Sequence, residues 1–116
     1  MARPKTNGLT DHEISIMNLV WRESSLTVAE ILHRLDRQPP PAYTSLLTTV
    51  RFLEKKGYLG FKKDGKAYRY YPKVSRKDYQ KFETTKLVEA LFDGKGLDLA
   101  VNLIRHEILS EKELSK

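Results

Sequence analysis

The sequence predicts a mainly α-helical protein with one small β-hairpin. Several stretches carry apolar residues at helical spacing, and some of these begin at a Thr-x-x-Glu capping box. One later stretch alternates with a period of two around an Asp-Gly turn. At 116 residues the chain has the size of one domain, or of a small domain with an appended module. We expect a first domain over residues 1–76 and a helical module over residues 77–116.

Two capping boxes predict the first two helices. Positions 10–13 (Thr-Asp-His-Glu) form one box, and the apolar residues that follow it predict a helix over residues 11–22. Positions 27–30 (Thr-Val-Ala-Glu) form the second box, which opens a short helix ending near Leu35. The three prolines at 39–41 then break the chain, because proline cannot continue a helix.

A third helix is predicted over residues 42–56, with Gly57 as its stop and with Leu46, Val50 and Leu53 as its inner stripe. The opposite side is polar and then basic, with small hydroxyl side chains near the helix start. Such a face suits a helix in a DNA groove, although most helices simply turn a polar face to solvent. The candidate DNA-contacting residues of this helix are Tyr43, Thr44, Ser45, Thr48, Arg51 and Lys55.

A β-hairpin is predicted next, because the aromatic-rich stretches 58–63 and 66–71 flank the turn Asp64-Gly65. We expect its tyrosines to pack across the strands rather than stack on bases. Cations gather near its tip, on the same flank as the third helix. The candidate DNA-contacting residues of the hairpin are Lys62, Lys63, Lys66 and Arg69.

The positive charge of the chain is concentrated in this first domain. Lys and Arg total 21 against 15 Asp and Glu, a net charge of +6. Residues 1–76 hold 14 basic and 7 acidic residues, whereas residues 77–116 hold 7 and 8. Three helices followed by a basic hairpin are the order of a winged helix-turn-helix. In that fold the third helix enters the major groove, and the hairpin, called the wing, contacts the DNA backbone or the minor groove.

Residues 77–116 are predicted to form a helical dimerisation module. Ser75 caps the helix that opens it, and a last short helix begins at Ser110. The segment 97–104 is apolar almost all round, so we expect it to be buried. Forty residues cannot bury it alone, and the simplest host is a second copy of the chain. The candidate interface residues are Tyr79, Phe82, Leu87, Leu91, Leu97, Val101, Ile104 and Ile108.

The chain lacks the residues that several classes of function require. The chain has no cysteine, which excludes disulfides, thiolate zinc sites and cysteine nucleophiles. Its three histidines lack ligand spacing, its glycines form no phosphate loop, and no nucleophile–base pair stands out. We therefore expect no enzyme, no metal and no cofactor. No apolar run reaches the roughly 20 residues of a membrane helix, so we expect a cytoplasmic protein without membrane insertion.

Seven short motifs occur in order between Leu9 and Tyr68: LTDHE, IM, LVW, LTVAEI, YTS, LEKKGYL and KDGKAY. Together they resemble the penicillinase-repressor family, the BlaI/MecI type of bacterial transcriptional repressor. The resemblance runs from Leu9 to Ser110. The resemblance implies a homodimer that binds a palindromic operator on double-stranded DNA and blocks transcription. It also implies inactivation through a membrane sensor-protease pathway, by cleavage after an asparagine in the dimerisation module. The matching bond here is Asn102–Leu103.

Three alternatives stay open. Phe52 occupies an outer position of the third helix where the family commonly has a basic residue, and it either packs against the wing or contacts a thymine methyl group. The same fold also serves as a protein–protein interaction adaptor without sequence-specific DNA binding, with the basic residues facing an acidic protein. A small-ligand sensor is the least favoured function, because the apolar terminal helices offer no obvious polar pocket.

Overall fold

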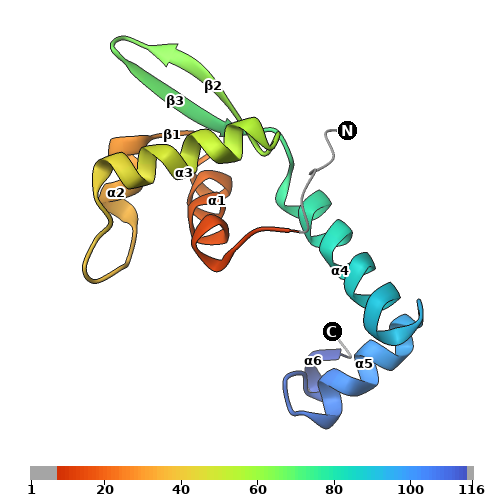
Figure 1. Cartoon of the computed structure of the whole chain (residues 1–116). Helices are drawn as coiled ribbons and strands as arrows, with labels where there is room; N and C mark the ends of the chain where they lie inside the picture. Colours follow the sequence, from red (N-terminus) through yellow and green to blue (C-terminus); the bar gives the residue numbers. More distant parts are fainter. Residues whose placement is uncertain (1–7, 115–116) are drawn as a thin grey trace. The chain divides into compact units, whose positions relative to one another are not determined.

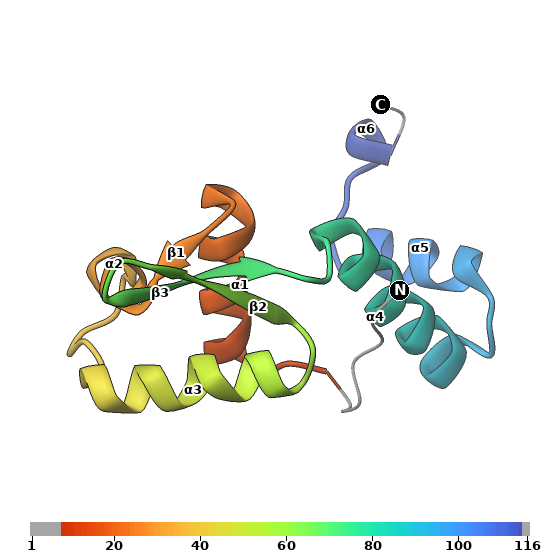
Figure 2. The same cartoon turned by 90° about the horizontal axis from the view of Figure 1, so that it is seen from above.

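The computed structural model describes residues 8–114, which form two compact units. The first ends at Tyr79 and the second begins at Gln80. The first unit contains a three-stranded antiparallel sheet in the order β1-β3-β2 (Figures 1 and 2), and Figure 1 shows its β2–β3 hairpin projecting away from α3. The boundary between the first domain and the helical module, placed by the sequence between residues 76 and 77, stays a prediction. The elements that precede this boundary are α1 (Asp11–Glu23), β1 (Leu26–Thr27), α2 (Val28–Arg34), α3 (Tyr43–Lys55), β2 (Leu59–Asp64) and β3 (Ala67–Pro72).

The three predicted helices and the hairpin are confirmed, with bounds that differ by at most one residue. Both capping boxes form, at Thr10 for α1 and at Thr27 for α2. The sequence did not predict β1, in which Leu26 pairs with Tyr70 of β3. This two-residue strand anchors one side of the hairpin to the helices.

The core of the first unit is built from the inner faces of its helices and from the base of the sheet. The predicted inner stripe of α3 is confirmed, since Leu46, Val50 and Leu53 are all fully buried. Burial of each such side chain stabilises the fold by about 1.5–3 kcal/mol. Their neighbours in the core include Ile16, Met17 and Val20 of α1, Ile31 of α2, and Tyr58 and Leu59 at the start of the hairpin.

Tyr79 belongs to this same core, which corrects its assignment to a dimer interface. Its ring centroid lies 5.7 Å from that of Trp21 and 5.9 Å from that of Tyr58. Its hydroxyl accepts a hydrogen bond from the backbone N–H of Leu9 at 3.2 Å. Only 8% of Tyr79 is exposed, so its side chain is committed to the first unit rather than to a second copy.

The capping box of α1 also binds the end of α3. The backbone N–H of Thr10 donates to Glu13 Oε1 at 2.9 Å, and Lys56 Nζ donates to Glu13 Oε2 at 2.9 Å. Both side chains of this ion pair are largely buried. Burial alone would raise the pKa of Glu13, but the Thr10 N–H and the Lys56 ammonium together hold that pKa below its ordinary value of 4.5.

The second unit consists of most of α4 (Arg76–Phe92), together with α5 (Gly96–Arg105) and α6 (Glu111–Leu114). The expectation that residues 97–104 are apolar almost all round is wrong, because Asp98, Asn102 and Arg105 follow one another at i, i+4 and i+7. At 100° per residue they form one polar stripe, which leaves the other faces of α5 apolar. Among residues 8–114, no helix has both the length and the apolar character needed to cross a membrane.

We expect the Glu13–Lys56 ion pair to make the free energy of unfolding depend on pH in the acidic range. A carboxylate whose pKa is lowered by folding stabilises the protein above its unfolded-state pKa, and this contribution is lost as the pH falls through the folded-state pKa. The free energy of unfolding should therefore fall as the pH drops below about 4.5. Glu13→Gln should flatten this acid limb in urea titrations followed by circular dichroism.

Glu113→Gln provides the matched control, because Glu113 belongs to the exposed capping box of α6. It should keep the wild-type dependence on pH. An acid limb in Glu13→Gln as steep as that of the wild type would contradict the role assigned to the buried pair.

Candidate nucleic-acid interface

The outer face of α3 carries a shallow hollow of about 320 Å³, lined by Thr48, Arg51, Phe52 and Lys55. All four side chains are exposed, whereas the inner stripe of the same helix is buried. The hollow combines a hydroxyl group, two cations and an aromatic ring. These groups can contact phosphates, base edges and apolar base substituents.

The first turn of α3 adds small polar side chains to this face. Tyr43, Thr44 and Ser45 are all exposed. Thr48 Oγ1 donates to the Thr44 carbonyl at 3.0 Å, so its hydroxyl proton is used within the helix and its oxygen remains an acceptor. Ala42, the residue before the helix, provides no side-chain cap. The backbone N–H groups of the first turn therefore remain available to an anion.

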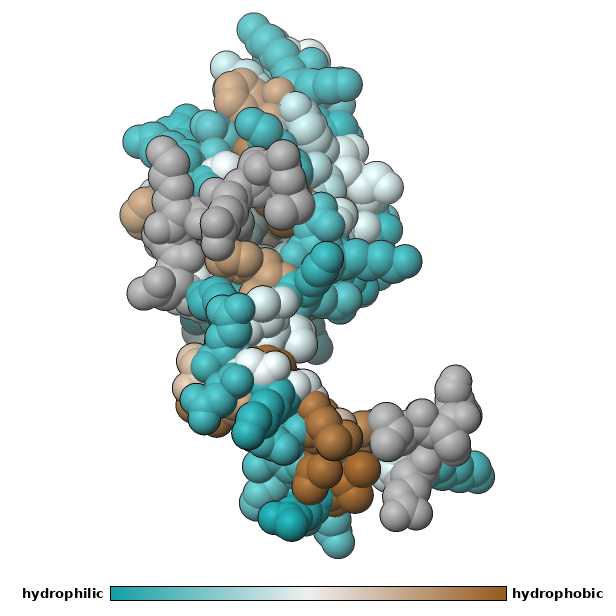
Figure 3. Space-filling model, turned by 90° about the vertical axis from the view of Figure 1, so that its right-hand side faces the viewer, coloured by the Kyte–Doolittle hydropathy of each residue, from teal (hydrophilic) through white to brown (hydrophobic). Residues whose placement is uncertain are grey.

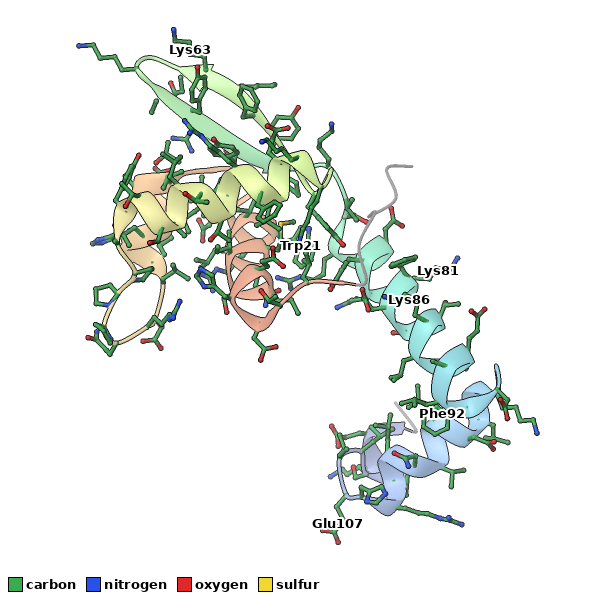
Figure 4. All side chains as sticks on the ribbon, viewed as in Figure 1. Trp21, Lys63, Lys81, Lys86, Phe92 and Glu107 are labelled. Atoms are coloured by element: carbon green, nitrogen blue, oxygen red, sulfur yellow. The ribbon has the colours of Figure 1, made fainter. Side chains whose placement is uncertain are left out.

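The wing carries exposed cations near its tip. Lys62, Lys63 and Lys66 are all exposed, and Figure 4 shows the Lys63 side chain projecting from the tip. The expected cross-strand packing of the tyrosines is confirmed by Tyr68, whose ring meets that of Phe61 edge-on at 5.1 Å between centroids. The aromatic residues thus stiffen the hairpin, while the lysines stay in solvent.

Gly60 is the position where the wing has no room for a side chain unless Tyr71 moves. It lies opposite Tyr71 in the β2–β3 register. A Cβ atom at Gly60 would stand 2.5 Å from the Tyr71 ring, well inside van der Waals contact. The Tyr71 ring therefore lies across the backbone of β2 at Gly60, where Lys62 Nζ lies 5.9 Å from the ring centroid.

Arg69 is placed differently from the sequence-based expectation that it contacts DNA. Its Nε donates to Asp64 Oδ2 at 3.1 Å, and its Nη1 donates to Glu30 Oε1 at 3.1 Å. The same Nη1 lies 3.4 Å from the carbonyl oxygen of Ser25. The guanidinium is engaged by acceptors from α2, from the residue just before β1 and from the wing. We therefore infer that Arg69 holds the wing in place rather than binding phosphate.

In the second unit, large apolar side chains are exposed along α4 and α5. Figure 3 shows strongly hydrophobic surface there. Leu91, Leu97 and Ile108 are 68–75% exposed, and Leu87 and Val101 are also exposed. Phe82 and Ile104 are half-buried, as are both residues of the bond predicted for cleavage, Asn102–Leu103. Within residues 8–114, no three metal-binding side chains lie together.

A family model described as Penicillinase repressor matches residues 9–116. The chain belongs to the penicillinase repressor family. The penicillinase repressor of Bacillus licheniformis is 23% identical over 112 residues, which are 97% of this chain and 88% of that protein. The methicillin resistance regulatory protein MecI of Staphylococcus aureus strain N315 is 27% identical over 113 residues, covering 97% and 91% respectively. The family is one of repressors and not of enzymes, as the sequence predicts.

A solved structure extends this likeness to the fold. The solution structure of monomeric Bacillus licheniformis BlaI in complex with the blaP half-operator is 28% identical, with a TM-score of 0.53. The likeness covers 65% of this chain and 92% of the BlaI chain. The predicted winged helix-turn-helix and the resemblance to the family are thereby confirmed.

We expect Arg69→Gln to loosen the wing, because it removes the charge that joins Glu30 to Asp64. Backbone amides of β1 and β3 should exchange with solvent faster, while those of α1 and α3 keep their protection. Hydrogen exchange followed by NMR measures both groups in one sample. Lys63→Gln removes an exposed cation from the same hairpin and should leave exchange unchanged. Equal exchange in Arg69→Gln and the wild type would show that the ion pairs do not hold the wing.

Proposed function

We propose that this chain is a transcriptional repressor that binds double-stranded operator DNA as a homodimer. The observation that carries the proposal is the exposed outer face of α3, which lies beside a wing with cations at its tip, in a chain of the penicillinase repressor family. A relative with a similar fold was solved on a half-operator, which supports DNA as the partner. Since a repressor acts on chromosomal DNA, we propose the cytoplasm as its compartment.

The proposed roles follow the chemistry of each side chain. Short residues at the start of α3 lie close to bases, whereas longer cations reach phosphates. Arg51 can hydrogen-bond a base edge with two donors, which gives it the strongest claim to base recognition. The proposed DNA-contacting set is Tyr43, Thr44, Ser45, Thr48, Arg51, Lys55, Lys62, Lys63 and Lys66.

We propose that residues 1–76 bind DNA and that residues 77–116 join two copies. Exposed apolar side chains of this size favour a protein partner, and a second copy supplies an identical surface. A two-fold symmetric dimer matches a palindromic operator with half-sites about one helical turn, or a multiple of it, apart. The proposed interface consists of Phe82, Leu87, Leu91, Leu97, Val101, Ile104 and Ile108.

Cleavage after Asn102 through a sensor-protease pathway is the proposed route of inactivation, supported by the family resemblance. The bond lies inside α5, where backbone N–H and C=O groups are engaged in helical hydrogen bonds. A protease requires an extended substrate, so cleavage would need local unwinding of α5. Loss of this helix would remove apolar residues from the proposed interface and separate the two copies.

Two substitutions separate base recognition from phosphate contact. Arg51→Ala should weaken operator binding by about 1–3 kcal/mol and relax the preference for one base pair. Lys63→Ala should weaken binding to all sequences about equally and reduce the salt slope, log Kd against log salt, by about one. Mobility-shift titrations on duplexes selected from a random pool measure both effects, and the selection itself reports symmetry and half-site spacing.

An unchanged Kd and salt slope in both variants would show that this face is not the DNA interface. Failure of the wild type to retain any duplex, together with salt-insensitive binding of an acidic protein, would favour the adaptor function instead.

We expect the wild-type protein to sediment as a dimer at micromolar concentration. Leu97→Glu places a charge on the exposed apolar face of α5 and should shift the protein towards monomer. Thr85→Glu adds the same charge at an exposed polar position of α4 and serves as the control. Unchanged helical circular dichroism would show that the variants remain folded. A monomeric wild type would contradict the proposed symmetry of the operator.

A further inference from the structure

Phe52 is an exposed aromatic side chain on one flank of the face proposed to bind DNA, about 60° around α3 from Lys55. Its ring is 56% exposed, and it lines the same hollow as Thr48, Arg51 and Lys55. The neighbouring positions of this face carry polar or cationic groups, which suit phosphates and polar base edges. A phenyl ring offers neither a charge nor a hydrogen bond, so its contribution to this face must be an apolar contact.

The wing lies on a different side of α3 from Phe52, so the Phe52 ring does not pack against it. Tyr70 of β3 lies beside Arg51 and Glu54, whose charges act on its hydroxyl. At 100° per residue, Phe52 and Glu54 are 200° apart around the helix, on nearly opposite flanks. Packing against the wing, one of the two alternatives left by the sequence, therefore does not fit this arrangement.

The Phe52 ring is held in position by a chain of contacts that starts at α1. Lys56 Nζ lies 5.2 Å from the centroid of the ring, in the range of a cation–π contact. Lys56 is itself fixed by its buried ion pair with Glu13, at 2.9 Å, and Glu13 is held in turn by the Thr10 backbone. An exposed ring that is supported in this way loses little conformational entropy when it meets a partner.

Among the four bases, thymine fits this hollow best. In the major groove it presents its C5-methyl group directly beside the O4 acceptor. The hollow places an apolar ring beside the donors of Arg51 and Lys55. We propose that Phe52 is a specificity-determining residue that contacts the C5-methyl group of a thymine in each half-site. This inference rests on the proposed DNA-binding function and adds to it a named base and a named chemical group.

Replacement of thymine by deoxyuridine tests the contact, because uracil lacks only the methyl group. The operators would be those selected from a random pool. In each test operator, deoxyuridine would replace one thymine in each half-site, at the two positions related by the symmetry of the operator. At one such position, the wild-type protein should lose affinity by about fourfold per half-site, the ratio expected for one buried methyl-sized group. Phe52→Ala should bind the thymine and deoxyuridine operators equally at that position and respond like the wild type at the others.

Two further variants make the result specific to this side chain. Phe52→Leu keeps an apolar contact and should retain part of the preference for thymine. Phe61→Ala removes another exposed ring, from the wing, and should retain all of this preference. The inference would be overturned if the change in affinity from thymine to deoxyuridine were the same for the wild type and Phe52→Ala at every position. That result would leave the repressor function intact. No binding of the wild type to any duplex would overturn both.

Discussion

Burial of one apolar stripe on α3 determines which side of the helix can meet a partner. Leu46, Val50 and Leu53 are excluded from water, and together they fix the rotation of the helix about its own axis. A shift of this stripe by one residue would turn the helix by 100° and move the outer hollow to the flank of the helix. The orientation of the functional face is therefore set by the hydrophobic effect acting on residues that never touch the partner.

The cations of α3, of its C-cap and of the wing divide into two groups with different roles. Lys56 and Arg69 are engaged by carboxylates within the protein, at 2.9 Å and 3.1 Å, and hold helix ends and the wing in place. Arg51, Lys55 and the three lysines near the tip of the wing are exposed. The charge count of the sequence therefore overstates the charge available to DNA, because it treats both groups alike. Under the proposed function, the exposed group is the one whose phosphate contacts would set the dependence of binding on salt.

Sequence patterns predicted the elements of the first unit because each depends on local chemistry: capping boxes, an apolar stripe and an Asp-Gly turn. They missed β1, since a strand of two residues has no periodicity and exists only through pairing with β3. They also did not reveal that Arg69 bonds to Glu30, 39 residues away along the chain, or that the hydroxyl of Tyr79 bonds to Leu9, 70 residues away. A residue type and its spacing show what a side chain can bind, but distant contacts decide whether it is already occupied.

The short strand β1 has a mechanical consequence for the wing. Thr27 pairs with Arg69 in the middle of β3 and also caps α2, so the middle of the hairpin is tied directly to the start of α2. Beyond Arg69, β2 and β3 continue without β1 through the pairs Lys63–Tyr68 and Asp64–Ala67. Only this short end of the wing is held by two strands alone. Under the proposed function, the position of the wing lysines is set by the same core that holds α3, so phosphate contacts by the wing and base contacts by α3 would be placed by one set of buried residues.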